Sequence, residues 1–241
     1  MQDAWLTLHL GTCGRLGGKR PVYRFRFNEI LRYSDLIVDG LLRSLWMTGL
    51  TVVLGLVVGT ACAAVLVYGP RRAHPFVLAY VETIRNTPFL VQLFFLFFGL
   101  ASIGFRMSAM VAAIFALTVN FGAYTTEVVR AGLQSVPRTQ FETAASLGLS
   151  PWHTFRDVVA FQAFRNVFPA LTSYVVLLFL GSSVVSQISA DDLMRAASFI
   201  ESRTFRSFEA YAVISLVYLA AVIVFRLAMS GVWHFYLRRR G

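Results

Sequence analysis

Cysteine and lysine are scarce in this 241-residue sequence. Its two cysteines, Cys13 and Cys62, are far apart and Cys62 lies inside a long apolar run, so neither a disulfide framework nor a metal site is predicted. The single lysine, Lys19, follows Gly18, but Cys13 stands five positions before that glycine and Arg20 comes next. A phosphate-binding loop needs glycine and serine or threonine at those places. The sequence therefore carries no nucleotide-binding motif, and no cofactor is predicted.

Catalytic patterns are missing as well. The four histidines are scattered without the spacing of metal ligands, and we interpret each as a loop or interface residue. The formal net charge is +10, yet the arginines stand at the ends of apolar runs rather than clustering on one folded face. A nucleic-acid partner is therefore not predicted. These absences together predict that the chain is not an enzyme.

Apolar residues dominate what is there. Hydrophobic residues make up 57% of the chain and its mean hydropathy is +0.64, which is typical of membrane proteins. A bilayer core of about 30 Å takes about 20 apolar residues to cross. Charged residues delimit five runs of roughly this length, and they predict an all-α integral membrane protein with five transmembrane helices. The predicted spans are residues 44–70, 86–105, 107–126, 166–190 and 208–226.

The segments that flank these spans differ from them in composition. Residues 1–26 form a tail that is glycine-rich and basic up to residue 21, and we expect synthesis to begin at Val22. Residues 27–45 mix apolar and charged positions in a pattern typical of an amphipathic helix on the bilayer surface. After the last span, Trp233 and the arginines 238–240 predict an interfacial tail.

A pair of small residues lies four positions apart in the first span, at Gly55 and Gly59. This spacing suits a close helix–helix contact, either within the chain or to a second subunit. Glycine is also common in membrane helices without any such contact. The sequence favours neither interpretation over the other.

The longest polar interruption runs from Asn120 to Pro169. Within it, residues 142–147 favour a short helix, and Gly148 has the place of a left-handed cap at its end. Ser150 and Pro151 then have the residue types that start a helix. The product is a helix, a sharp turn and another helix at the water-facing end of a membrane bundle. Such an element suits docking against a soluble partner.

This interruption resembles the EAA loop of the permease subunits of bacterial ABC importers. Glu142-Thr143-Ala144 and Gly148 have the spacing of that loop. Three further stretches are similar to the polar amino acid branch of the family: Ala123-Tyr124 to Gln140, Thr87-Pro88 to Phe94, and Ser202 to Arg206 with Tyr211. The resemblance covers about residues 27–240, as one transmembrane permease domain with its loop at about 128–168. It implies the type I ABC importer permease fold with a cytoplasmic coupling helix.

The chain departs from the family pattern in three places. Thr143 replaces the usual second alanine, and Ala160-Phe161 stands where the family has Leu-Pro. Leu180 occupies the position of a lysine that often precedes the fourth-span serines. The first two departures bear on partner docking, and the third removes any substrate role for that lysine.

The resemblance implies one set of functional residues, and the serines near the end of the fourth span form a second candidate set. The ATPase-coupling set is Glu142, Thr143, Ala144, Ala145, Leu147 and Gly148. The candidate translocation path is lined by Ser182, Ser183 and Ser186, although serines in a helix also bond back to their own backbone, which we favour. Glu127, at the end of the third span, is expected to pair with Arg130.

Arginine counting bears on orientation. With the carboxyl tail in the cytoplasm, the loop at 128–165 is cytoplasmic, and the amino terminus and residues 191–207 face the periplasm. The basic residues before the first span then lie outside, against the positive-inside rule, unless residues 1–21 are absent. We keep this orientation because the tail and the family resemblance agree on it.

These observations predict an ABC importer subunit of the bacterial inner membrane, crossing it several times, for a polar amino acid or a related amine or opine. The resemblance implies three protein partners: a cytoplasmic ATPase dimer, a second permease subunit of like or unlike sequence, and a periplasmic substrate-binding protein. Membrane lipid surrounds the spans. The alternative is a subunit of an ion-coupled secondary transporter, which would need acidic groups at mid-membrane that the spans lack. A membrane anchor without transport would leave the long loop unexplained.

Overall fold

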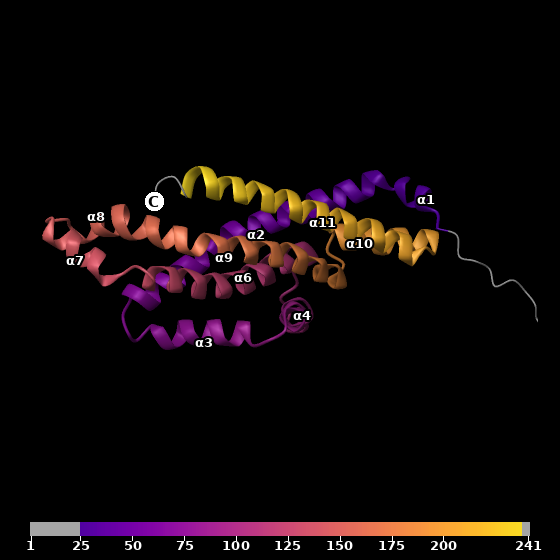
Figure 1. The fold of residues 1–241 in the computed structure, drawn as a ribbon. Coiled ribbons are helices and arrows are strands. Elements are labelled where there is room, and N and C mark those ends of the chain that lie inside the picture. Colours follow the sequence, from indigo (N-terminus) through magenta and orange to yellow (C-terminus); the bar gives the residue numbers. More distant parts are fainter. Residues whose placement is uncertain (1–24, 238–241) are drawn as a thin grey trace, which may run out of the picture.

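The computed structural model describes residues 25–237, and every regular element in that range is helical (Figure 1). The α-helices are α1 (Phe27–Leu31), α2 (Ser34–Tyr68), α3 (His74–Arg85), α4 (Phe89–Phe94), α5 (Leu100–Ser102), α6 (Ala109–Gln134), α7 (Arg138–Ser146), α8 (Pro151–His153), α9 (Ala160–Gly181), α10 (Leu193–Thr204) and α11 (Ser207–Val232). Wider or tighter turns form η1 (Phe95–Gly99), η2 (Thr154–Val159), η3 (Ser182–Ile188) and η4 (Trp233–Leu237). The predicted start at Val22 and the arginines 238–240 lie outside the described residues.

Four helical segments are long and apolar enough to cross a membrane: Ser34–Tyr68, Ala109–Gln134, Pro151–Ile188 and Ser207–Phe235. A fifth span results if the bent pair His74–Arg85 and Phe89–Ser102 counts as one. The predicted class, an all-α membrane protein with five spans, is confirmed with this bent pair as the second span.

The prediction of a separate surface helix over residues 27–45 is wrong. Helix α1 ends at Leu31, and from Ser34 onward the chain is already in α2, which continues for 35 residues through the first predicted span. Ile37, Gly40 and Ser44 of this segment are buried, because α10 packs on α2 there, whereas apolar positions such as Val38 and Leu42 stay exposed. A Cβ on Gly40 would lie only 3.0 Å from the Cα of Leu193. The periodicity was therefore that of a helix packed against a neighbour.

The second predicted span, residues 86–105, is not one straight helix. Helices α3 and α4 meet at an angle of 107° around Pro88. Proline lacks the N–H that would bond to the carbonyl of Ile84 and restricts the residue before it, so the helix stops at Arg85. The Gln92 side chain donates instead to the carbonyl oxygens of Ile84, at 2.7 Å, and Thr87, at 3.0 Å. The Gln92 amide thus satisfies the carbonyl groups that the break leaves without a backbone donor.

Three other boundaries differ from the predicted ones. Helix α6 continues beyond Glu127 to Gln134, so the glutamate lies within the helix and not at its end. The fourth span begins before residue 166, because α9 starts at Ala160. The predicted outer loop at 191–207 contains the 12-residue helix α10. The sequence did not indicate these longer helices, because the added turns contain polar residues that are typical of loops.

Helices α2 and α6 touch at their backbones. A Cβ on Gly59 would lie 2.5 Å from Thr125 and 2.9 Å from the carbonyl oxygen of Gly122, and one on Gly55 would lie 2.6 Å from the Phe121 ring. Of the two interpretations left open for these glycines, the close helix contact is therefore the one present, and it lies within the chain. We call this contact the α2–α6 seam.

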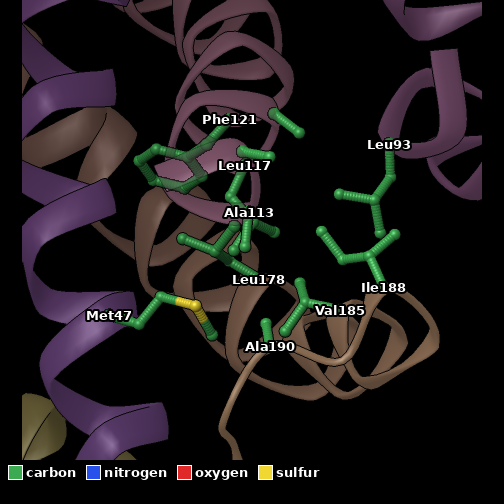
Figure 2. Packing of buried hydrophobic residues seen from close by; sticks show 11 residues of the cluster. Met47, Leu93, Ala113, Leu117, Phe121, Leu178, Val185, Ile188 and Ala190 are labelled. Atoms are coloured by element: carbon green, nitrogen blue, oxygen red, sulfur yellow. The ribbon is translucent and has the colours of Figure 1, made fainter. Parts of the chain in front are cut away.

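An apolar core lies beside the seam, where α4 and η3 meet α6. Figure 2 shows Leu93 pointing toward Ile188 and Val185, with Met47 and Leu178 on the other side of the α6 residues. In Figure 1, α7 and α8 form one end of the elongated bundle, and α1 with the α10–α11 turn forms the other. The polar loop and helix α10 are therefore at opposite ends of the molecule.

Candidate coupling loop and translocation path

Helix α7 carries the predicted coupling residues on an exposed surface. It follows Pro137 and runs from Arg138 to Ser146. Among the predicted residues only Ala144 is buried, at 2% exposure, whereas Leu147 is 73% exposed. Glu142 is exposed, and the structure shows no hydrogen bond or ion pair to its carboxylate among the described residues. An apolar and an acidic side chain thus face outward from one short helix.

The short helix was predicted to begin at Glu142, which would have placed that carboxylate in the first turn, and this start is wrong. The helix begins at Arg138, four residues earlier, and its first turn has no acidic residue. The dipole effect falls off within the first turn. A role for the Glu142 carboxylate in capping α7 is thereby removed, which leaves its charge available to a partner.

The turn after α7 has the geometry predicted from Gly148. Its φ is +72°, in the left-handed region. The Gly148 N–H donates to the carbonyl of Ala145 at 3.0 Å, and the Leu149 N–H donates to that of Ala144 at 3.1 Å, the two bonds of a Schellman motif. The Ser150 hydroxyl then accepts from the backbone N–H of His153 and caps the next helix. Both predicted helix signals are confirmed.

The loop is tied to the bundle by a small set of contacts at its two ends. The Asn166 side chain donates to the Ser135 hydroxyl at 2.8 Å, and Gln162 donates to Gln140 at 3.4 Å. An apolar cluster of Val136, Val159 and Ala163 packs beneath them. These contacts join the loop to the ends of α6 and α9.

The departures from the family pattern are visible in this region. Thr143 is exposed on α7, on the surface that the coupling residues share. Ala160 and Phe161 lie in the first turn of α9, which follows η2 without a break, because no proline stands there to stop it. The loop thus returns to the membrane as one continuous helix.

The serines of the candidate path point back to their own backbone. The hydroxyls of Ser182, Ser183 and Ser186 donate to the carbonyls of Phe179, Leu180 and Ser183, at 2.7, 2.8 and 2.8 Å. Ser182 is fully buried. Ser183 borders a cavity of about 430 Å³ together with residues of α10 and α11. Each of the three hydroxyls thus donates to a carbonyl of its own helix. A role in the translocation path stays a prediction, and Ser183, which borders this cavity, is the best placed for it.

A polar group at the α3–α4 break was not assigned from the sequence. The Asn120 amide donates to the Gln92 side chain at 3.0 Å, so the break is anchored to the middle of α6. The sequence did contain the two residues, because the second predicted span includes Gln92 and the third includes Asn120. What the sequence lacked was the bend that brings them together.

Next to this group, one carboxylate joins two arginines. Glu127 lies 2.8 Å from Arg130, as predicted, and 3.7 Å from Arg85, which also stacks over the Tyr124 ring at 5.5 Å. Arg85 is the last residue before the break in the second span. The ion pair of Arg85 with Glu127 therefore links the broken span to the half of α6 that leads into the coupling loop. The described part of the chain contains no cluster of metal ligands.

The comparisons with known proteins agree with this arrangement. The chain matches the family described as the inner membrane component of binding-protein-dependent transport systems over residues 47–237, and it belongs to that family. It is thus a permease subunit of an ABC importer and not an enzyme, and the family implies a separate ATPase partner. This finding removes the alternative of an ion-coupled secondary transporter.

Relatives are found in several bacteria. A putative glutamine transport system permease protein GlnP of Rickettsia bellii is 32% identical over 76% of this chain and 85% of its own length. The glutamine transport system permease protein GlnP of Escherichia coli K12 is 30% identical over 90% and 96%. The arginine transport system permease protein ArtQ of Bacillus subtilis is 29% identical over 82% and 91%.

Two solved structures are similar. A chain of an amino acid ABC transporter, crystallised with histidines, is 34% identical and has a TM-score of 0.82, with 90% of this chain and 100% of that chain covered. A chain of the MetNI methionine ABC transporter is 20% identical with a TM-score of 0.71 over 83% and 96%, a likeness that supports the fold alone.

Proposed function

We propose that this chain is the permease of an importer for a polar amino acid or a related amine or opine in the bacterial inner membrane. The names of the relatives support this substrate class, since they transport glutamine or arginine. A second permease subunit and a periplasmic binding protein complete the pathway, as the family description implies. The arrangement suits a half-channel, because the described residues form at most five spans, an odd number without an internal repeat.

The observation that carries the mechanism is the exposed α7 with its fixed turn. Helix α7 inserts into a groove of the ATPase, with Glu142 meeting a basic residue and Leu147 an apolar pocket. Closure of the ATPase dimer moves α7, and the contacts of Ser135 with Asn166 and of Gln140 with Gln162 pass this movement to α6 and α9. The bundle then tilts and exposes the path on the other side of the membrane.

We expect Glu142→Gln to lower substrate-stimulated ATP hydrolysis and uptake without lowering the amount of inserted protein. A hydrogen bond to a charged group contributes about 1.5–3 kcal/mol, so the coupled rate should fall by at least about tenfold. The measurement is uptake and ATPase activity of the complex in proteoliposomes, with membrane levels checked. Glu82→Gln, at an exposed glutamate of α3, is the matched control and should leave both rates unchanged. Equal activity of the two variants would exclude Glu142 from the ATPase contact.

We expect the two ends of the bundle to lie on opposite sides of the membrane. Cysteines that replace Ser198 on α10 and Thr139 on α7, both exposed, report on these ends in a background without Cys13 and Cys62. An impermeant thiol reagent should label Ser198→Cys in cells with a permeabilised outer membrane, and Thr139→Cys only after the inner membrane is opened. Labelling of Thr139→Cys from outside would reverse the topology.

A further inference from the structure

Helix α10 is seated on α2 at the end of the bundle opposite to α7 (Figure 1). Its first turn lies against Gly40, where even a methyl group would meet the backbone of Leu193 at 3.0 Å. The Leu193 N–H donates to the buried Ser44 hydroxyl of α2 at 3.0 Å. The preceding residue, Asp192, is the N-cap of α10 and accepts from the Arg195 N–H at 2.8 Å. We call this junction of α2, α10 and α11 the α10 seat.

The Asp192 carboxyl at this seat is 2% exposed, and its Oδ2 atom has no hydrogen-bond partner among the described residues. The buried hydroxyl of Tyr218 is also without a hydrogen-bond partner among these residues. The Tyr218 hydroxyl, on α11, is near enough to Ser44 and Asp192 to interact with both. An ionised carboxylate enclosed in this way bears the full cost of lost hydration on one oxygen.

The charges around the seat do not neutralise Asp192. Asp191, the exposed neighbour, lies 3.5 Å from Arg43 of α2 and 3.0 Å from Arg195, so it engages both nearby arginines. Asp39 of α2 borders the same small cavity and adds negative charge. From α11 the uncharged Tyr218 faces the group. Among residues 25–237 the structure shows two ion pairs to Asp191 but none to Asp192.

Burial accordingly raises the pKa of the Asp192 carboxyl to about 6, against the lowering by the backbone N–H groups of Arg195 and Met194. The cause is desolvation, which disfavours the charged form. In its protonated form the carboxyl keeps Oδ1 as the cap acceptor, and the oxygen without a partner becomes a neutral O–H. The neutral acid therefore satisfies this seat better than the carboxylate does.

We propose that Asp192 is a proton-binding site that holds α10 on α2 and α11. With the proton bound, the α10 seat is closed. After the proton leaves, the buried charge draws in water, and α10 with its turn into α11 loosens at this end of the bundle. The site rests on the proposed function only for its orientation, which would expose it to the periplasmic pH.

The sign of the pH dependence follows from linkage. Because the pKa of the seated carboxyl is above its ordinary value of 3.8, proton binding favours the seated form. The stabilisation is complete at pH values below about 4 and is lost as the pH rises through about 6. A shift of about two pH units corresponds to a preference on the order of 100-fold between the two protonation states.

Spin labels on Leu42 of α2 and Ser202 of α10, both exposed, test the proposal in the full chain without its cysteines, in lipid nanodiscs. Pulsed electron–electron distance measurements do not require transport, so their result is independent of the proposed function. From about pH 4.5 to about pH 8 we expect one narrow distance to give way to a broader and longer one, with a midpoint near 6. A distribution that stays the same across this range would overturn the proposal.

Two sets of variants locate the effect. Asp192→Asn and Asp192→Ser keep the cap, since both residue types cap helices well, but neither titrates. Both variants should abolish the pH-dependent change. Two variants are used so that poor expression of one does not leave the question open. Asp191→Asn removes the neighbouring carboxylate and should leave the midpoint within about half a pH unit, because Asp191 is exposed and screened. A transition that persists in Asp192→Asn, or disappears in Asp191→Asn alone, would assign the proton to another group.

Discussion

Uptake by the assembled importer is expected to fall by about tenfold or more when Gly148 is replaced by valine, while the spans still insert. The φ of +72° at this glycine costs an L-residue about 1–2 kcal/mol, and a β-branched residue more. No atom lies within 4 Å of a Cβ built there, so the effect is one of backbone conformation and not of crowding. Relief of the strain would change the turn and misdirect α7.

The measurement is substrate-stimulated ATP hydrolysis and uptake in proteoliposomes at matched protein levels. Gly104 offers a control of the same kind, because its φ is +97° and no atom is near its Cβ position either, but it lies outside the coupling loop. Gly104→Val should therefore leave coupling near the native level. Gly148→Asn should retain most activity, since asparagine tolerates the left-handed region. If Gly148→Val transports normally, the loop does not transmit the movement.

The second large effect is expected at the α2–α6 seam. In Gly59→Leu the new side chain meets Thr125 and the Gly122 carbonyl at less than contact distance, and backbone atoms cannot move aside as a flexible side chain would. Overpacking of this kind costs about 3 kcal/mol, which corresponds to a fall in Tm of about 10 °C. The measurement is thermal unfolding of the detergent-purified chain, followed by the loss of monodisperse protein on gel filtration.

Gly49 lies ten residues earlier on the same helix and is the matched control. No atom lies within 4 Å of its Cβ position, and it is exposed. Leucine is the better helix former, so Gly49→Leu should unfold at the native temperature or slightly above. A similar loss of stability in both variants would show that glycine acts on α2 through flexibility and not through the seam.

Local chemistry decided which predictions succeeded. The end of α7 was predictable because Gly148, Ser150 and Pro151 act through their own backbone, and the contacts they make are within a few residues of them. The spans were predictable from apolar length alone. Glu142 was placed in the wrong turn because the start of α7 is fixed by Pro137, which ends the preceding segment, and the sequence had no cap residue to mark it.

The failures have a common cause in contacts between distant residues. The amide of Gln92 permits the break at Pro88 by replacing a lost donor, and no periodicity can show which carbonyl a side chain will reach. Residues 34–45 look like a surface helix until α10 is in place on Gly40 and Ser44. The burial of Asp192 likewise depends on α2, whose Ser44 lies 149 residues before Leu193.

The close contact between α2 and α6 at the seam also bears on how far a small tilt would displace the end of the bundle. Two helices that touch at their backbones cannot slide or rotate against each other, so they turn as one rod. The 26 residues of α6 extend about 39 Å, and α7 is attached to one end of it. A tilt of about 5° at that end displaces the opposite end by roughly 3 Å over this length. Under the proposed function, we therefore expect small strokes of the ATPase to produce displacements of this size at the far face, without bending either helix.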